Sequence, residues 1–217
     1  MKKLTLILLF ICDVTFSQLN LDSIEMEMIR LTRHDRDLLG TSYLYTSDKC
    51  KKTSEVHLDY TLKFLNGSTL SHDESIPFYK NYVLTYPSDR YALFNKDSIK
   101  VQISDDYYKK AAKWKLETEI MTGCYVDNIN VENINKIIAK KLFNKFKHSS
   151  SHYHVMTKNI NVYNVYRGFI SVDYRKEIFY GQEKYVFYCV GVFDKSIYLS
   201  SSAKEYKKSK ESNYYFD

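Results

Sequence analysis

The C-terminal part of the chain restricts the fold most strongly, because it is rich in strand-like segments separated by turn residues. Residues 184–193 are apolar at odd and even positions alike, which is typical of a strand covered on both faces. Turn residues occur at Gly168, Gly181-Gln182 and Asp194-Lys195. They separate some of the other strand-like segments, which are His152–Thr157, Ile160–Tyr166, Phe169–Tyr174, Glu177–Tyr180 and Ile197–Ser200. The pattern predicts an antiparallel meander with residues 184–193 at its centre.

Three segments have the apolar spacing and the terminal residues of helices. They cover residues 23–39, 105–121 and 131–147. Asp22 is the expected N-cap of the first helix, and Gly40 follows its last turn. Asn130 is the expected N-cap of the third, whose lysines are concentrated near its C-terminal end, as the helix dipole favours.

Residues 55–65 carry the clearest alternating pattern in the first half of the chain. The apolar residues Val56, Leu58, Tyr60, Leu62 and Phe64 alternate with Glu55, His57, Asp59, Thr61 and Lys63. A period of two predicts a strand with one buried and one solvated face. Asn66-Gly67 follows directly and is a strong hairpin signal.

Together these elements predict an α+β fold. It comprises an N-terminal helix, a first-half strand or hairpin, two central helices and a C-terminal antiparallel β-meander packed against helices. We expect the helices to cover one face of the sheet. Residues 18–200 suffice for a single domain with its own core, and residues 201–217 form a polar, lysine-rich tail.

The first 17 residues have the features of a secretory signal peptide. Lys2 and Lys3 precede an apolar run from Leu4 to Ile11, and the expected cleavage follows Ser17. No later stretch is apolar over the length that spans a bilayer. The sequence therefore predicts an exported protein (periplasmic, at the cell surface or secreted) with no transmembrane span in the mature chain. The net charge of +6 is modest and accompanies no nucleic-acid-binding motif, so we expect no nucleic-acid partner.

Two groups of residues are candidates for acid–base chemistry. On a strand, Glu55, His57 and Asp59 would share one face, where a carboxylate can orient an imidazole. His57 and Asp59 are therefore candidate catalytic residues, with an ordinary solvated face as the alternative. His72-Asp73-Glu74 lies in a predicted loop and is a further candidate, with capping of the next element as its alternative.

Three histidines are candidates for metal binding. On a strand, His152 and His154 would point to the same side, as two ligands of one metal ion must. A third ligand would come from His148 or from a carboxylate. The alternative is a polar joint whose histidines face water. The sequence has no glycine-rich phosphate loop and no His-Glu-x-x-His motif, so no cofactor is predicted.

The helix predicted over residues 131–147 is a candidate for binding an anionic surface. Opposite its apolar face it carries Lys136, Lys140, Lys141, Lys145 and Lys147. Such a helix can bind an anionic membrane or polymer, or it can be a core helix with solvated lysines.

The cysteines leave two alternatives open. Cys50, Cys124 and Cys189 are far apart in the sequence and form no Cys-x-x-Cys motif. They either form one disulfide, in one of three pairings, or are three small buried residues. Cys124 has no histidine near it in the sequence that would activate it as a nucleophile.

These patterns favour an exported, non-enzymatic binding or interaction module that acts on a partner in the cell envelope or outside the cell. One alternative is a small metal-dependent or acid–base hydrolase that uses His152 and His154 with an acidic partner. The other is a binder of anionic surfaces through the lysine-rich helix.

Overall fold

The computed structural model describes residues 18–65, 70–74, 87, 90, 91, 94, 116–160 and 164–197. Five sequence predictions lie wholly or largely outside these residues. They are the signal peptide over residues 1–17, the hairpin at Asn66-Gly67, most of the helix over residues 105–121, most of the strand over residues 197–200, and the tail over residues 201–217.

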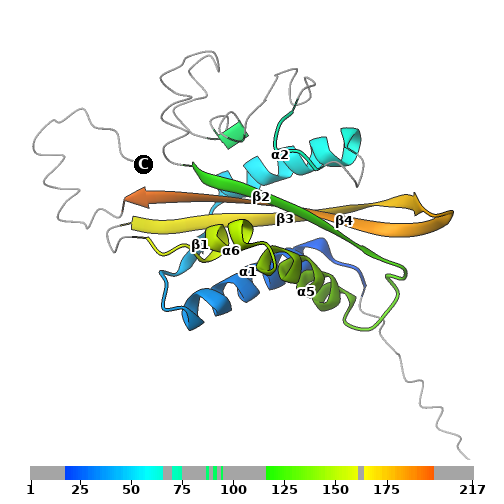
Figure 1. Ribbon diagram of the computed structural model, residues 1–217, viewed down its shortest axis with the longest axis horizontal. Coiled ribbons are helices and arrows are strands. Elements are labelled where there is room, and N and C mark those ends of the chain that lie inside the picture. The colour runs from blue at the N-terminus through cyan, green and yellow to red at the C-terminus, as the bar shows by residue number, and fades with distance from the viewer. Residues whose placement is uncertain are drawn as a thin grey trace, which may run out of the picture.

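A four-stranded sheet forms the centre of the described part and confirms the α+β class (Figure 1). Its two longest strands, β3 (Asn164–Phe179) and β4 (Gln182–Ile197), form a hairpin. β2 (Leu116–Val126) is antiparallel to β4, and β1 (Leu44–Thr46) is parallel to β3. The strand order is therefore β1-β3-β4-β2. β4 lies between two strands, which confirms the predicted central position of residues 184–193.

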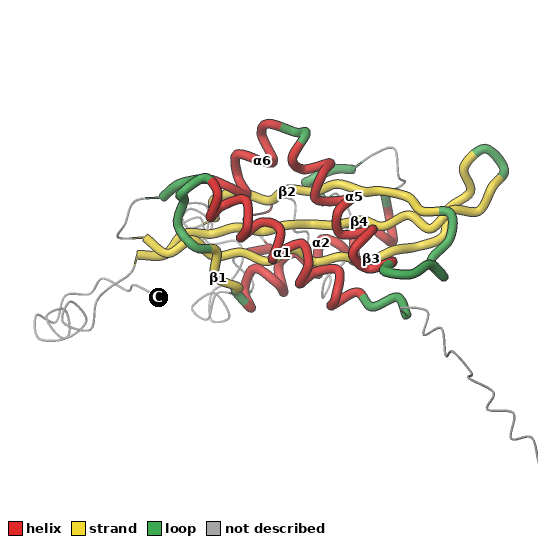
Figure 2. The backbone as a smooth tube through the Cα atoms, turned by 90° about the horizontal axis from the view of Figure 1, so that it is seen from below, coloured by secondary structure: helices red, strands yellow, loops and turns green. Residues whose placement is uncertain are grey.

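Helices cover both faces of this sheet, so the expectation of a single covered face is wrong. α1 (Leu21–Leu38), α5 (Ile134–Lys147) and α6 (Ser150–Thr157) lie on one face. α2 (Asp48–Phe64) lies on the other, as Figures 1 and 2 show. The physical reason is the sheet itself, because its central strand is apolar on both sides and needs a cover on each.

Each face of the sheet carries its own core. On the side of α1, α5 and α6 the core includes Ile24, Met28, Ile138, Leu142, Phe146, Phe187 and Cys189. On the side of α2 it includes Leu58, Met121, Val186, Tyr188, Val190 and Val192. Successive residues of β4 thus alternate between the two cores, as the pleat of a strand requires.

The strand predicted over residues 55–65 is wrong, because these residues belong to α2. Ser47 caps the helix by accepting a hydrogen bond from the Cys50 backbone N–H at 3.3 Å. The buried face contains small polar residues, so it shows no apolar stripe in the sequence. Thr53 and Thr61 satisfy their buried hydroxyls by donating to the carbonyls of the residues four positions earlier. The alternation of apolar residues is thus compatible with a helix that buries hydroxyl groups.

Other elements differ from the sequence predictions at their ends or in type. Asn20, and not Asp22, caps α1, since its side chain accepts from the Ser23 backbone N–H at 2.8 Å. Gly40 follows α1 with a φ of +63°, which agrees with its predicted role. α5 begins after Asn133, and not after Asn130.

Two predictions of element type are also wrong. Residues 152–157 lie in the helix α6 and not in a strand, and residues 116–121 lie in the strand β2 and not in a helix. Both segments contain polar and apolar residues without a sustained period, so tertiary packing decides their conformation.

Gly168 lies inside β3 and does not form the predicted turn. It pairs with Phe193 of β4, whose ring occupies the space of a side chain at position 168. A Cβ atom at position 168 would lie 2.5 Å from Phe193 Cδ1 and 3.0 Å from the Val192 carbonyl oxygen. Glycine is therefore required here by the close approach of an aromatic ring.

Replacing Gly168 by alanine is expected to lower the free energy of unfolding by about 1–3 kcal/mol, because the added methyl group overpacks the sheet. Urea denaturation of the purified protein measures this cost. In a Phe193→Leu background the same substitution should cost less, since the ring that it meets is gone. An equal cost in both backgrounds would contradict this explanation.

The edge of β3 is covered partly by a side chain of α1. β1 pairs with β3 only over Tyr166–Gly168. Farther along, Glu25 Oε1 accepts a hydrogen bond from the Val172 backbone N–H at 2.9 Å, and Lys51 Nζ lies 3.6 Å from Glu25 Oε2. Burial raises the pKa of the Glu25 carboxyl above its usual value. The carboxylate of Glu25 thus takes the place of a neighbouring strand.

The cysteines of the described part agree with the alternative in which they are three small buried residues and form no disulfide. Cys50, Cys124 and Cys189 are all free and buried. Burial raises the pKa of each thiol, so none is poised to act as a thiolate. Among the described helices, none combines the length and the apolar composition needed to cross a membrane.

Candidate functional site

A cluster of charged side chains is buried between α2 and the sheet. It joins residues that are far apart in the sequence, and we call it the His57 cluster. Its members are His57 of α2, His72 and Glu74 of the segment 70–74, Arg90, and Glu119 of β2. The side chains of all but His72 are fully buried, and His72 is 41% exposed.

Arg90 and His57 hold the two carboxylates of the cluster. Arg90 Nη2 donates to Glu119 Oε1 at 2.7 Å and Oε2 at 2.9 Å, and Arg90 Nη1 lies 3.3 Å from Glu74 Oε1. His57 Nδ1 lies 2.9 Å from Glu74 Oε1. The other ring nitrogen of His57 lies 2.9 Å from the carbonyl oxygen of Ser71. The cluster therefore fastens the segment 70–74 and residue 90 to α2 and β2.

The hydrogen-bond partners of His57 show where protons lie in this cluster. A carbonyl oxygen only accepts, so the nitrogen facing Ser71 carries a proton. The other nitrogen faces the carboxylate of Glu74, which also lies against Arg90, so a second proton lies between His57 and Glu74. The proton between His57 and Glu74, together with the contacts of Arg90 to both glutamates, pairs the buried groups of the cluster with one another.

The charges around Glu119 shift its acidity. Burial alone would raise the pKa of this carboxyl. The charges of Arg90 and His57, together with the hydrogen bonds from His72 and Arg90, instead lower the pKa of Glu119 to about 2. Glu119 is therefore ionised in the folded protein at neutral pH.

Acid–base chemistry in this cluster is limited to its rim. His72 Nδ1 lies 3.0 Å from Glu119 Oε1, so a carboxylate orients the partly exposed imidazole. The remaining charged groups are enclosed and paired with one another, which is typical of a structural network. Sequence reasoning singled out His57, His72 and Glu74 but missed Arg90 and Glu119, which no local pattern connects to them.

A second buried network involves Asp194 of β4. Arg167 Nε donates to Asp194 Oδ1 at 2.8 Å, and the Tyr91 hydroxyl donates to Asp194 Oδ2 at 2.5 Å. Cys50 Sγ lies 3.5 Å from the same oxygen. Burial and the Asp194 charge raise the pKa of the Cys50 thiol well above its usual value, which disfavours nucleophilic chemistry there.

The structure separates the other predicted acid–base pair. Residues two apart on a helix lie on nearly opposite sides. His57 is buried, whereas Asp59 is exposed, so α2 does not bring the imidazole and the Asp59 carboxylate together.

The predicted metal ligands are likewise not brought together. Because α6 is a helix, His152 and His154 do not share a side as they would on a strand. His148 Nδ1 lies 2.6 Å from the Asn144 carbonyl oxygen, and the His152 ring packs edge-on against Phe146. Burial and the nearby His72 lower the pKa of His152. Within the described part of the chain, no three His, Cys, Asp or Glu residues are grouped to hold a metal ion.

A basic groove lies on the outer surface between α1 and α5, which run in parallel. Asn135 joins their N-terminal ends through hydrogen bonds with Gln18 and Asn20, and Lys147 Nζ lies 2.7 Å from Asp35 Oδ2 near the other end. The α1–α5 groove has a volume of about 390 Å³ and is lined by Ser23, Met26, Glu27, Arg30, Arg33 and Lys136.

The charge of the α1–α5 groove is predominantly positive. Its acidic residue, Glu27, is held by Arg30 through hydrogen bonds of 2.6 and 2.8 Å. The hydrogen bond from Arg30 and the charges of Arg30, Lys136 and Lys140 lower the pKa of Glu27. Lys140 therefore lies in the same electrostatic field as the residues that line the groove.

The lysines of α5 form two rows. Lys136, Lys140 and Lys147 face α1, where the first two lower the pKa of Glu27 and Lys147 pairs with Asp35. Lys141 and Lys145 face β2, where their charges oppose the effect of burial on the pKa of Cys124. Lys141 also donates a hydrogen bond to the Tyr125 carbonyl. The apolar face of α5 is buried in the core, as predicted, and the lysines lie on its exposed part.

Known proteins add no further constraint on the site. Comparison with protein-family models, with curated proteins and with solved structures finds no match to this chain.

Proposed function

We propose that this protein is an exported binding module that holds a linear polyanion in the α1–α5 groove. The observation that supports it is the gathering of Arg30, Arg33, Lys136 and Lys140 along two parallel helices. Arg30 pairs with Glu27, which lines the same groove, so the charges of the other three cations are left for a ligand. Export is inferred from the signal-like segment over residues 1–17.

The shape of the groove favours a polymer over a flat surface. Lys136 and Lys140 are one helical turn apart, and Arg30 and Arg33 are similarly spaced on the neighbouring helix. Cations repeated along a line match a chain that carries repeated carboxylate, sulfate or phosphate groups. A helix that binds a bilayer directs its apolar side chains into the membrane. α5 instead buries its apolar face in the core of the protein.

The buried networks support a binding role over the hydrolase alternative. The charged groups of the His57 cluster pair with one another, and the Cys50 thiol is held protonated. His152 and His154 lie on different sides of the helix α6, so they are not placed to bind one metal ion together. The hydrolase alternative has therefore lost the geometry on which it depended.

A double substitution of Lys136 and Lys140 by glutamine is expected to weaken polyanion binding roughly 10- to 30-fold. Each exposed lysine contributes on the order of 1 kcal/mol to binding an anionic surface. Isothermal titration of the purified protein with heparin, a soluble sulfated polysaccharide, measures the affinity. Raising the salt concentration should weaken the binding further, because the contacts are solvent-exposed ion pairs.

The matched control removes two lysines from the opposite side of the molecule. Lys52 and Lys63 are exposed on α2, and their substitution by glutamine changes the net charge equally. We expect this control to bind heparin nearly as well as the unaltered protein. An equal loss in both double variants would refute a localised site. Binding to phosphatidylglycerol vesicles without binding to heparin would replace the polymer by a membrane.

A further inference from the structure

A small hollow lies at the tip of the β3–β4 hairpin, beyond the end of α2. Arg175 of β3 donates hydrogen bonds to the carbonyls of Leu62 and Leu65, which fastens the end of α2 to the sheet, and the hairpin continues past this point. The hollow has a volume of about 180 Å³ and is lined by Tyr125, Phe179, Tyr180, Gln182 and Lys184.

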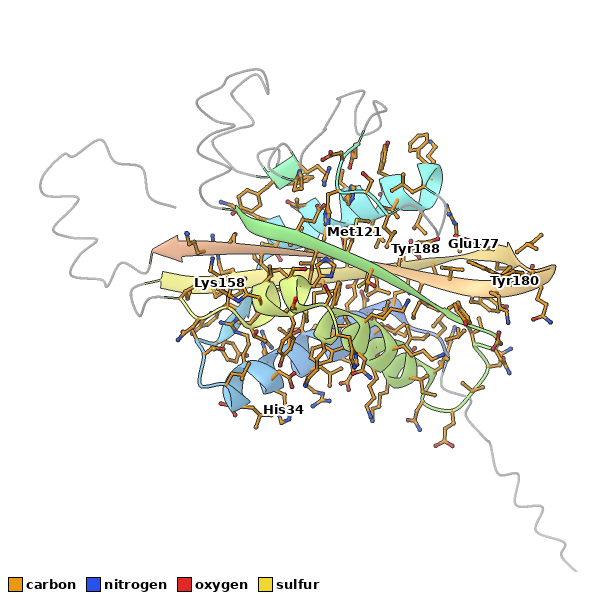
Figure 3. All side chains as sticks on the ribbon, viewed as in Figure 1. His34, Met121, Lys158, Glu177, Tyr180 and Tyr188 are labelled. Carbon is orange, nitrogen blue, oxygen red and sulfur yellow. The ribbon has the colours of Figure 1, made fainter. Side chains whose placement is uncertain are left out.

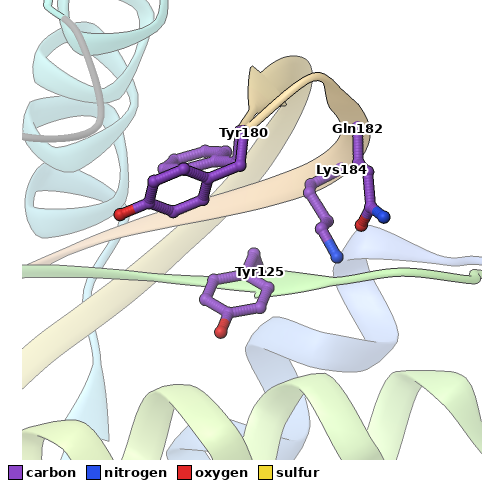
Figure 4. A pocket seen from close by; sticks show the side chains of 5 residues that line it. Tyr125, Tyr180, Gln182 and Lys184 are labelled. Atoms are coloured by element: carbon purple, nitrogen blue, oxygen red, sulfur yellow. The ribbon is translucent and has the colours of Figure 1, made fainter.

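Aromatic and polar side chains divide the walls of this hollow. Figure 4 shows Tyr180 and Tyr125 on two sides, and Gln182 and Lys184 along a third. The rings of Tyr125 and Phe179 are stacked, with centroids 6.2 Å apart and an angle of 28° between their planes. The hollow therefore offers flat apolar surfaces next to an amide and an ammonium group.

The backbone at Tyr180 is strained without any gain from burial. Tyr180 and Gly181 form the two-residue turn of the hairpin, with φ values of +49° and +77°. Asn, Asp or Gly is the usual first residue of such a turn, and a bulky side chain there costs free energy. Yet Tyr180 is fully exposed at the end of the hairpin (Figure 3). A ligand that packs against the Tyr180 ring would offset the free-energy cost of this backbone conformation.

The ion pairs around the hollow leave it close to neutral. Three cations at the tip each form an ion pair with a carboxylate. The pairs are Arg175 with Glu177, Lys176 with Glu183, and Lys184 with Asp127. The tip thus differs from the α1–α5 groove and favours an uncharged ligand.

From these observations we infer a second binding site, which holds one pyranose ring of a neutral carbohydrate. The C–H groups on the face of a sugar ring pack against aromatic rings such as Tyr125 and Tyr180. The Gln182 amide donates to and accepts from hydroxyl groups, and the Lys184 ammonium has donors beyond the one that Asp127 takes. The volume is below the roughly 300–1,000 Å³ of pockets for drug-sized ligands, and it suits a single ring.

NMR titration of the purified protein with neutral hexasaccharides tests this site. The probes are the α-1,4 and β-1,4 hexamers of glucose and the β-1,4 hexamers of N-acetylglucosamine and xylose. In about 0.5 M NaCl, which screens polyanion binding, we expect at least one to shift the resonances of Tyr125, Tyr180 and Gln182. Tyr180→Ala and Tyr125→Ala should each weaken binding at least about tenfold. Tyr45→Ala, which removes an exposed tyrosine of β1, is the matched control and should have no effect.

Three results would overturn the inference. They are no response to any of the four sugars at about 10 mM, an unchanged affinity in Tyr180→Ala, and binding of the tip to phosphatidylcholine vesicles that is abolished by Ile178→Ser, which removes an exposed apolar side chain of β3 near the turn. Sugar binding that persists in the Lys136→Gln/Lys140→Gln variant supports the site, because it separates the hairpin hollow from the α1–α5 groove. Failure of one site therefore leaves the other to be judged by its own experiment.

Discussion

Substitution of Arg90 by methionine is expected to lower the free energy of unfolding by about 3–5 kcal/mol. The guanidinium contacts Glu119 at 2.7 and 2.9 Å and Glu74 at 3.3 Å, and all three side chains are fully buried. Methionine keeps most of the volume but leaves two carboxylates near each other without this cation. Urea denaturation at neutral pH measures the loss.

Arg30→Met is the matched control, because Arg30 also pairs with a glutamate. Its side chain is 61% exposed, so water replaces the lost partner of Glu27. The urea midpoint of this variant should stay close to that of the unaltered protein. Similar midpoints for the Arg90→Met and Arg30→Met variants would show that the His57 cluster does not stabilise the fold.

Acidification is expected to remove on the order of 3 kcal/mol of stability that Glu119 supplies at neutral pH. The pKa of this carboxyl falls from 4.5 to about 2 on folding, so the folded protein binds the proton less tightly than the unfolded chain. The stabilisation is therefore complete above about pH 5 and declines as the pH falls toward 2. Denaturation curves at a series of pH values between 2 and 6 follow this loss.

The Glu119→Gln variant isolates the contribution of this one group. It should be less stable than the unaltered protein at pH 7, and its stability should depend less on pH below 5. Glu25 acts with the opposite sign, because burial raises its pKa and its protonation favours the folded state. Subtracting the pH profile of Glu119→Gln from that of the unaltered protein removes the contributions of Glu25 and other carboxyls. If the two profiles run parallel, Glu119 is not the source of the acid sensitivity.

The parts of the fold that could be predicted from the sequence are those whose buried faces are apolar. Residues 184–193 are apolar on both sides, and they form the central strand β4. α5 was predicted because its buried face is apolar as well. α2 was not, since Thr53, His57 and Thr61 occupy its buried face and satisfy their polar groups by hydrogen bonds. A hydrophobic pattern does not reveal such a face.

The candidate site was predictable only to the extent that it lies on one element. The lysines of α5 were identified from their spacing, but the pairing of α5 with α1 requires the tertiary structure. The His57 cluster shows the same limit, because Arg90 and Glu119 come from distant segments. Gly168 was predicted to form a turn because the sequence does not show the ring of Phe193, which leaves no room for a side chain at this position of β3.

The contact of Glu25 with the Val172 backbone has a consequence for self-association. Within the described residues, no strand pairs with this edge of β3 beyond its short pairing with β1, and an open strand edge of this kind invites a strand from another copy to join it. Glu25 occupies one of the donors that such an intruder would need, and Lys51 beside it adds a charge that an incoming chain would have to displace. Two side chains from opposite helical layers thus protect the sheet against fibre growth along this edge.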